Sequence, residues 1–176
     1  MDRRRVKPGV NLVSKTEIYL FVTEPRPTND FVDPATFATH LRALLADFSA
    51  PTLQAIREQI GPDSNIVFRP LEGLLMPRPW SSGRVVLIGD TVHATTPHLA
   101  SGACIGIEDA IVLSEEFASH AQVPTAFAAF EQRRWERCRM VVENSARLGE
   151  IEIAGGDKDE HARIMRESLM ALAQPI

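Results

Sequence analysis

The residues best suited to chemistry in this sequence are a carboxylate, Asp90, and two small residues, Gly102 and Ala103, which begin twelve positions further on. An ionised aspartate accepts hydrogen bonds and donates none, so it suits the hydroxyl groups of a ribose or another polyol. Where small residues open a helix, its free backbone N–H groups and the positive end of its dipole favour an anion. Small residues also let a flat ligand approach the backbone closely. Together these features predict a ligand with a hydroxylated chain and a ring that becomes negative during turnover, and reduced flavin is such a ligand.

The elements that must position these residues are predicted from the stretch around them. The apolar, β-branched run 85–88 (VVLI) is typical of a strand buried on both faces inside a parallel sheet. Gly89 ends this run and places Asp90 at the carboxyl end of the strand, which is the edge where open α/β sheets bind ligands. After a polar loop, an apolar pattern at helical spacing runs from residue 103 to about residue 120. The predicted unit is therefore strand, carboxylate, loop and helix N-terminus.

This stretch resembles the second FAD motif of the flavin-dependent aromatic hydroxylases, the group that includes the p-hydroxybenzoate and salicylate hydroxylases. The residues that match the motif are Gly89, Asp90, His93, Pro97, Gly102, Glu108, Asp109 and Ala110. The resemblance implies that Asp90, next to Gly89, holds the ribityl chain of FAD, and that Pro97 lies against the isoalloxazine. It also implies that the amides from Gly102 through Ala103 to Cys104 face the pyrimidine edge of the ring.

The sequence departs from the family at two places within the motif. The family often has Gly-Gln where Ala100-Ser101 stand, and often has Asn where Cys104 stands. Contacts made by the backbone survive both changes. We expect no catalytic side chain in this set, because the oxidising chemistry belongs to the cofactor and the protein supplies position and electrostatics.

The turn that binds the FAD pyrophosphate in this family is missing from the sequence. A flavin hydroxylase opens with a strand and a G-x-G-x-x-G turn, whereas none of the ten glycines here stands two positions from another. The resemblance therefore covers only the C-terminal half of such an enzyme. It implies a mixed α/β (α+β) chain with a partial p-hydroxybenzoate-hydroxylase-like FAD/NAD(P)-binding fold that lacks the N-terminal Rossmann unit. We interpret the chain as a fragment, a split-gene product or a degenerate relative.

Two functional hypotheses follow from this interpretation. By resemblance, the first is the C-terminal portion of a flavin-dependent monooxygenase that hydroxylates a small aromatic substrate with FAD, NAD(P)H and O₂. We expect the chain alone to be inactive and to retain no FAD. An open sheet edge and an apolar patch would lead it to pair with a missing N-terminal half or with further copies of itself. The alternative is a truncated, non-catalytic relative that acts through protein contacts.

Composition excludes several other classes of protein. The net charge of −4 and the 44% of hydrophobic residues are those of a globular protein with no general attraction to nucleic acid. The basic run Arg3 to Arg5 has no interleaved aromatic residues, so we interpret it as a solvated terminus. No stretch is long and apolar enough to span a membrane. The two cysteines lack the spacing of a metal site or a disulfide framework and favour a reducing, cytoplasmic setting.

Two other constellations of polar residues carry weaker signals. His93 and His98 stand near Asp90, but on an irregular loop without the spacing of a zinc site, so we predict no metal. A serine hydrolase is equally unsupported, because the sequence has no G-x-S-x-G elbow.

The sequence is predicted to divide near residue 78. Residues 1–78 would form part of the substrate-side sheet with two helices, and residues 79–176 the C-terminal part of the FAD-binding domain with its closing helices. Asp33-Pro34 predicts the start of one helix, an N-cap followed by proline at the first position. Pro51 predicts the start of the second.

The strands of the first part are less clear. Residues 17–23 (EIYLFVT) and 65–69 (NIVFR) have the composition of strands, and residues 1–11 that of a loop. Tyr19 and Phe21 share one face of the first strand, either as ordinary core residues or as neighbours of an aromatic substrate.

The C-terminal part is predicted to be helical. Pro124 begins a long helix that resembles the closing helix of the family at residues 130–134 (FEQRR), and Gly155-Gly156 breaks it. Residues 159–173 predict a last short helix. The arginines of the long helix are interleaved with glutamates, which favours a solvent face held by salt bridges.

Overall fold

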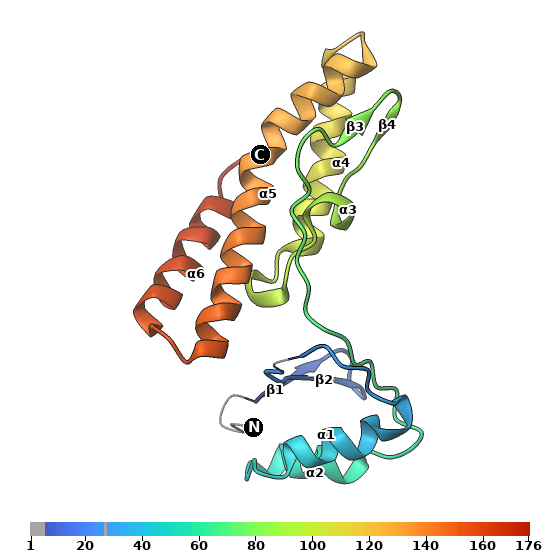
Figure 1. Cartoon of the computed structure of the whole chain (residues 1–176), viewed down its shortest axis with the longest axis vertical. Helices are drawn as coiled ribbons and strands as arrows, with labels where there is room; N and C mark the ends of the chain where they lie inside the picture. The colour runs from blue at the N-terminus through green and yellow to red at the C-terminus, as the bar shows by residue number, and fades with distance from the viewer. Residues whose placement is uncertain (1–5, 27) are drawn as a thin grey trace. The chain divides into compact units, whose positions relative to one another are not determined.

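The computed structural model describes residues 6–26 and 28–176, and these form two compact units (Figure 1). One unit ends at Pro70, and the other runs from Leu71 to Ile176. The predicted boundary near residue 78 falls inside the second unit, and the roles assigned to the two parts stay predictions. Arg3 to Arg5 lie outside the described residues. Within the described ranges, no helix has both the length and the apolar character needed to cross a membrane.

The first unit contains an antiparallel hairpin of β1 (Lys7–Leu12) and β2 (Ile18–Thr23). The strand predicted over residues 17–23 is thus confirmed, whereas the loop predicted up to residue 11 is wrong from Lys7 onward. Pro8 and Gly9 suggested a turn, but a strand with one partner tolerates proline. A Cβ on Gly9 would collide with the ring of its cross-strand partner Phe21, so the ring lies over the backbone of Gly9 and would have to move for any larger residue.

Two helices cover one face of this hairpin. The 3₁₀ turn η2 (Pro34–Thr36) leads into α1 (Phe37–Leu45), and α2 (Pro51–Gln59) follows. The predicted cap is confirmed, since the Asp33 side chain accepts from the Ala35 amide at 3.0 Å. The core of the unit is Leu45, Ile56 and Ile60, packed with strand residues that include Val10, Leu20 and Val22.

The opposite face of β2 is open. Tyr19 and Phe21 are 57% and 40% exposed, so their interpretation as core residues is wrong. The predicted alternation of the two faces is present, but Leu20 and Val22 are the residues that turn to the helices. Residues 65–69 form no strand either: Ile66 packs on the core while Val67 is 76% exposed.

The second unit begins with a short hairpin in place of a buried parallel strand. β3 (Ser81–Ser82) pairs antiparallel with β4 (Val85–Val86), and Gly83 between them has a φ of +60°. Val85 is 63% exposed. The prediction of a strand buried on both faces at 85–88 is therefore wrong for this structure, because Ser81–Ser82 is the one pairing partner among the described residues.

Helices make up most of the second unit. They are α3 (Asp90–His93), the 3₁₀ turn η3 (Pro97–Leu99), α4 (Gly102–Ser119), α5 (Val123–Ala154) and α6 (Lys158–Leu172). α5 lies beside both α4 and α6 (Figure 1). The predicted helix starting near Pro124, the break at Gly155 and the last helix are confirmed; Gly155 ends α5 in the left-handed conformation.

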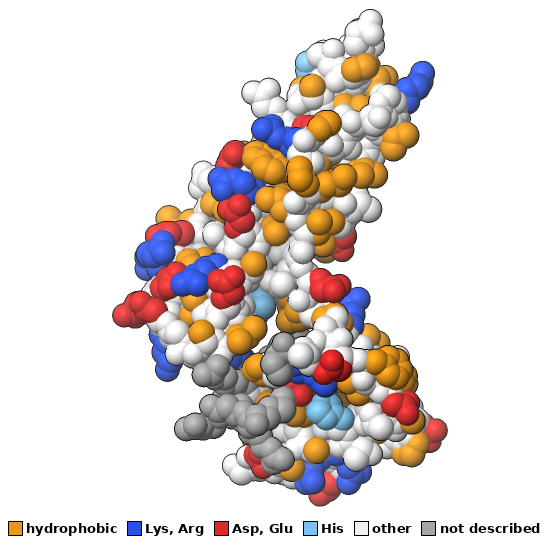
Figure 2. Space-filling model, viewed as in Figure 1, with side chains coloured by type: hydrophobic (Ala, Val, Ile, Leu, Met, Phe, Trp, Pro, Cys, Tyr) orange, Lys and Arg blue, Asp and Glu red, His pale blue; other side chains and the backbone are white. Residues whose placement is uncertain are grey.

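The face of α4 that is buried differs from the expected one. Its buried residues are Ile105, Asp109, Val112 and Glu116, two of which are acidic. The apolar positions 103, 107, 110 and 117, which predicted the helix, are exposed. Ile107, for example, is 63% exposed. Hydrophobic side chains are thus abundant on the surface of this unit (Figure 2).

Candidate functional site

Gly89 and the single turn α3 follow the apolar run 85–88, of which Val85–Val86 forms β4. The point at Gly89 where this run ends is called the strand end. Gly89 has φ of 61° and ψ of −143°, a conformation that a residue with a side chain rarely adopts. Its carbonyl accepts from the amides of Val92 and His93, both at 3.0 Å, and so begins the turn. Asp90 is the first residue of α3 and is exposed. Within the described part of the chain, no side chain or amide bonds to its carboxylate, which is therefore available to a ligand.

The loop from α3 to α4 ends in a second unusual conformation. Pro97 opens η3 and is exposed, and Ala100 then adopts the left-handed region with φ of 50°. This position is one of the two at which the sequence departs from the family motif, which often has glycine there. Glycine fits because a left-handed conformation costs it nothing.

The first turn of α4 carries no side-chain cap. The N-cap residue Ser101 donates its hydroxyl to the Leu99 carbonyl at 2.8 Å instead of accepting from the helix. The amides at the start of a helix have no partner within the helix. Gly102 is half-buried, and Ala103 and Cys104 are exposed. The start of α4 thus offers uncapped N–H groups beside small side chains.

A close approach of α4 brings the strand end and this helix together. A Cβ on Gly106 would lie 3.7 Å from the Cα of Gly89, so the second turn of α4 packs directly against the strand end. Gly102 is packed against the loop, since a Cβ there would lie 3.1 Å from Cγ2 of Thr95. Apart from Pro97, which opens η3, the predicted ligand-binding residues thus lie on two elements that touch one another. Contact of these residues with a ligand stays a prediction.

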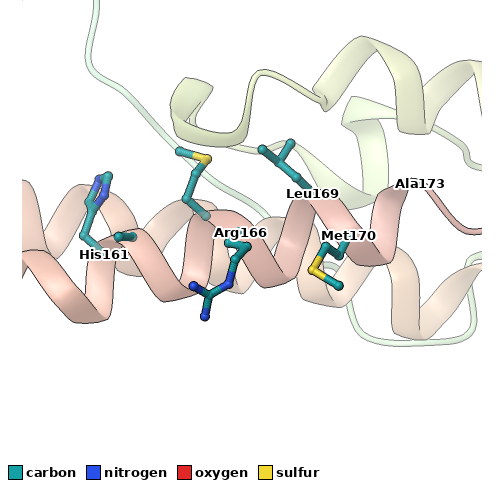
Figure 3. Close-up of a pocket in the computed structure, with 7 residues that line it drawn as sticks. His161, Arg166, Leu169, Met170 and Ala173 are labelled. Atoms are coloured by element: carbon teal, nitrogen blue, oxygen red, sulfur yellow. The ribbon is translucent and has the colours of Figure 1, made fainter.

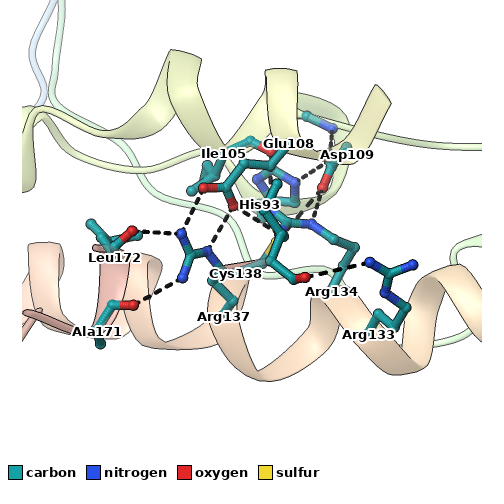
Figure 4. A network of polar contacts seen from close by, with 12 residues as sticks. His93, Ile105, Glu108, Asp109, Arg133, Arg134, Arg137, Cys138, Ala171 and Leu172 are labelled. Atoms are coloured by element: carbon teal, nitrogen blue, oxygen red, sulfur yellow. Dashed lines mark hydrogen bonds and ion pairs between the residues drawn. The ribbon is translucent and has the colours of Figure 1, made fainter. Parts of the chain in front are cut away.

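Beneath this surface lies a buried ionic network (Figure 4). Oδ2 of Asp109 accepts from the Gly89 amide at 2.8 Å and pairs with Nε2 of His93 at 2.6 Å. Oδ1 of the same carboxylate accepts from Nε of Arg134 at 2.7 Å. The side chains of His93, Asp109 and Arg134 are all fully buried. One carboxylate therefore joins the strand end, α3, α4 and α5.

The network continues to the end of α6. Glu108 lies within 2.8 Å of Arg134 and receives both Nε and Nη2 of Arg137 at 2.7 Å. Arg137 also donates to the carbonyls of Ala171 and Leu172, at 2.9 and 2.8 Å. These carbonyls belong to the last turn of α6, where a cation is favoured by the helix dipole.

The same partners determine the ionisation of the network. Burial would lower the pKa of His93, but the hydrogen bond to Asp109 and the nearby Cys138 raise it to about 10. Burial would raise the pKa of Asp109, yet hydrogen bonds from His93, Gly89 and Arg134 hold it below its usual value. Both shifts favour the charged forms, an imidazolium at His93 and a carboxylate at Asp109.

Three residues of the cluster have the chemistry of metal ligands. The ligand atoms of His93, Asp109 and Cys138 lie within 4.8 Å of one another. However, both oxygens of Asp109 are already bonded to donors, one of them the Arg134 cation. This set differs from the residues considered in the sequence, which were Asp90, His93 and His98. In the structure Nδ1 of His98 bonds to the Thr96 hydroxyl at 2.9 Å.

The arginines of α5 have two different roles, and only the solvent-exposed one was predicted from the sequence. Arg139 pairs with Glu136 and Glu143, which confirms a solvent face held by salt bridges there. Arg134 instead is fully buried, and Glu131 accepts from the Trp80 amide and the Ser81 hydroxyl, both at 2.9 Å. The available signal was the acidic pair Glu108-Asp109 inside a helix whose other residues are largely apolar.

A separate open groove runs along α6 (Figure 3). It is lined mainly by apolar side chains, including Met165, Leu169 and Met170, with His161 and Arg166 at its edge. The groove contains none of the residues predicted for ligand binding.

Comparison with known proteins relates this chain to a group of flavoenzymes. Residues 74–145 match the model of a family described as an FAD binding domain. The chain is 32% identical over 164 residues to the aurachin C monooxygenase/isomerase of Stigmatella aurantiaca, covering 93% of this chain and 41% of that protein. It is 31% identical over 135 residues to the FAD-dependent urate hydroxylase of Klebsiella pneumoniae, covering 74% of this chain and 33% of that protein.

A solved structure shares the fold. The crystal structure of Klebsiella pneumoniae HpxO with FAD and uric acid matches with a TM-score of 0.68 at 23% identity, covering 95% of this chain and 46% of that one. A structure of an HpxO variant with FAD matches with a TM-score of 0.73. The likeness confirms the predicted mixed fold. The chain spans less than half the length of each of these proteins.

Proposed function

This chain belongs to the FAD-dependent monooxygenases and hydroxylases, and from that premise we propose that it supplies the part of their FAD site that holds the flavin and ribityl end. The observation that carries the proposal is the strand end itself. There an exposed carboxylate, Asp90, which has no hydrogen-bond partner among the described residues, precedes an uncapped helix start at Gly102. The two elements are in contact through Gly89 and Gly106.

The residues present fit that part of FAD. A ribityl chain carries hydroxyl donors, and the Asp90 carboxylate offers acceptors that nothing in the described chain occupies. The pyrimidine edge of the ring carries acceptor oxygens, and the amides at Gly102, Ala103 and Cys104 are donors without helical partners. Pro97 is exposed and would lie against the ring. FAD, when bound, supplies the redox chemistry with NAD(P)H and O₂, and these residues bind and orient it.

An exposed apolar stripe on α4 supports the proposal that a further polypeptide binds there. The apolar positions 103, 107, 110 and 117 face outward, while the buried face combines Ile105 and Val112 with the acidic Asp109 and Glu116. A helix usually buries its apolar side, so the exposed apolar stripe favours a covering partner. Val85 on β4 is exposed as well. We propose that a G-x-G-x-x-G-bearing segment, or a second copy of this chain, covers this stripe. Chain purified alone is then expected to be colourless and oligomeric.

Two exposed aromatic side chains of the first unit support the proposal that the substrate is aromatic. Tyr19 and Phe21 stand side by side on β2 with ring centroids 6.2 Å apart, and both are exposed. Two adjacent exposed rings offer stacking and edge contacts to a planar molecule. The proposed activity of the complete assembly is therefore hydroxylation of a small aromatic compound.

An FAD titration followed by flavin fluorescence tests the proposal. The chain is mixed with the N-terminal, G-x-G-x-x-G-bearing segment of a relative, as wild type, as Asp90→Ala and as Asp63→Ala, which removes an exposed carboxylate from the other unit. Loss of a hydrogen bond to a charged group costs roughly 1.5–3 kcal/mol, so Asp90→Ala should weaken binding roughly tenfold to a hundredfold. Asp63→Ala should bind as wild type does. Equal affinity for all three would remove Asp90 from the site.

The exposed stripe also favours a second function, that of a non-catalytic interaction module. In that case the chain would bind the N-terminal segment through α4 but the mixture would take up no FAD. Light scattering shows the pairing in both cases, and the visible absorbance of the separated complex, which reveals bound FAD only for the first function, separates the two.

A further inference from the structure

We propose that Asp109 is a positioning residue that fixes Asp90 by clamping both ends of α3 from below; its role toward flavin rests on the proposed function. Asp109 is fully buried, so it cannot itself touch a ligand. Its atom Oδ2 bonds to the Gly89 amide at 2.8 Å, just before α3, and to Nε2 of His93 at 2.6 Å, at the end of α3. Asp90 stands between these two anchor points.

The turn needs such a clamp because it cannot hold itself. α3 has four residues, and a helix of one turn is unstable in water when nothing else supports it. Gly89, with its φ of 61°, has more conformations open to it than any other residue type would have. A bond from its amide to a buried carboxylate selects one of them. The direction in which Asp90 leaves the strand end is thereby fixed.

The clamp also joins the two halves of the proposed site. Asp109 is part of α4, whose first turn offers the amides from Gly102 to Cys104. The carboxylate that holds the strand end is therefore carried by the helix that would bind the ring edge. Arg134 secures that helix in turn, through Asp109 at 2.7 Å and the Ile105 carbonyl at 3.0 Å. The distance between Asp90 and the start of α4 is then set by a rigid, buried connection.

An amide in place of the carboxylate breaks this arrangement. All the groups that contact Asp109 through nitrogen are donors: the Gly89 amide, His93 and Arg134. An asparagine has one acceptor oxygen and one donor NH₂ group. In either orientation the NH₂ group of the asparagine faces another donor, either Arg134 or the Gly89 amide and His93. The matched change Glu108→Gln alters the neighbouring carboxylate, which bonds to Arg134 and Arg137 but not to α3.

Hydrogen exchange of the backbone amides, followed by NMR on the full chain, tests the clamp without any cofactor. We expect Asp109→Asn to speed exchange of the Gly89, Val92 and His93 amides by at least about tenfold relative to wild type, because a charge-assisted bond is lost. Glu108→Gln should leave these three amides as in wild type. Unchanged protection in Asp109→Asn, or the same loss in Glu108→Gln, would overturn the proposal.

A second variant covers the case in which Asp109→Asn does not fold. Asp109→Glu keeps the charge that Arg134 needs but moves the carboxylate by one methylene. It should fold, shift the amide resonances of Gly89 and His93, and speed their exchange. A folded Asp109→Glu chain with wild-type resonances and exchange at Gly89 and His93 would contradict the clamp.

Titration with FMN, which carries the ring and the ribityl chain, tests the link to Asp90. In the wild-type background Asp109→Asn or Asp109→Glu should raise the dissociation constant roughly tenfold. In the Asp90→Ala background the same change should have no further effect, because the residue it positions is gone. Additive effects would show that Asp109 does not act through Asp90. The titration uses the same mixture with the N-terminal segment of a relative. If wild type binds no FMN in that mixture, the proposed function fails, while hydrogen exchange still decides the clamp.

Discussion

Replacing Arg134 by methionine removes the cation that balances Asp109 inside the second unit. Arg134 is fully buried and makes three contacts there: Nε to Asp109 at 2.7 Å, Nη1 to Glu108 at 2.8 Å, and Nη2 to the Ile105 carbonyl at 3.0 Å. Methionine fills a similar volume but leaves the carboxylate with one fewer charged partner. Breaking a buried pair from one side costs about 3–5 kcal/mol, since the remaining charge stays desolvated.

The assay is urea unfolding followed by tryptophan fluorescence. Both tryptophans, Trp80 and Trp135, belong to the second unit, so the signal reports on this unit alone. With a urea dependence of ~2 kcal/mol/M, a loss of 3–5 kcal/mol moves the midpoint down by about 1.5–2.5 M. Arg139→Met is the matched control on the same helix, because its pairs with Glu136 and Glu143 are exposed to solvent and contribute little.

The two variants must differ for the reasoning to hold. A midpoint that falls sharply for Arg134→Met and hardly moves for Arg139→Met supports a buried ionic network that holds α4 to α5. If both variants unfold at the wild-type midpoint, the contacts of Arg134 contribute no stability and the network does not hold the unit together.

Three further predictions follow from single residues. Ala100→Gly should raise the free energy of unfolding by roughly 1 kcal/mol in urea, because glycine relieves the left-handed conformation at φ 50°; an unchanged or lower value would contradict this. His93 has a folded pKa of about 10 against 6.5 when unfolded, so its contribution to stability should be complete below pH 6.5 and lost as pH rises toward 10. The urea midpoints of wild type and His93→Gln should therefore converge between pH 6.5 and 10, and a constant difference between the two midpoints over this range would show that His93 is not charged. Gly102→Val should weaken FMN binding and leave the Val85–Val86 hairpin folded by NMR, because its Cβ already meets Thr95 at 3.1 Å; normal binding would place the ligand elsewhere.

Local signals predicted the elements well. Asp33 caps the turn before α1, Pro51 opens α2, and Gly155 ends α5, all as predicted from residue type. These outcomes depend on the backbone within a few residues, where capping groups and allowed φ values decide the conformation. Asp90 is exposed at the start of α3, directly after the apolar run 85–88, although the buried parallel strand predicted for that run is not formed.

Contacts between distant segments could not be predicted in the same way. The apolar stripe of α4 predicts a helix but does not say which surface covers it, and in this structure Asp109 faces inward while Ile107 faces out. Arg134 resembles Arg139 in the sequence, but the first meets a carboxylate 25 positions away and is buried. Pairing across such distances depends on the packing of α4 against α5, which no local pattern encodes.

The most direct test of the account is an NMR titration with FMN of the isotope-labelled chain mixed with the unlabelled N-terminal segment of a relative. The flavin end of the site is proposed to consist of Asp90 and the first turn of α4. FMN should therefore shift the amide resonances of residues 89–91 and 102–104, and Asp90→Ala should abolish or strongly reduce these shifts. Shifts confined to other regions, such as the groove on α6, or shifts at 102–104 that persist unchanged in Asp90→Ala, would contradict it.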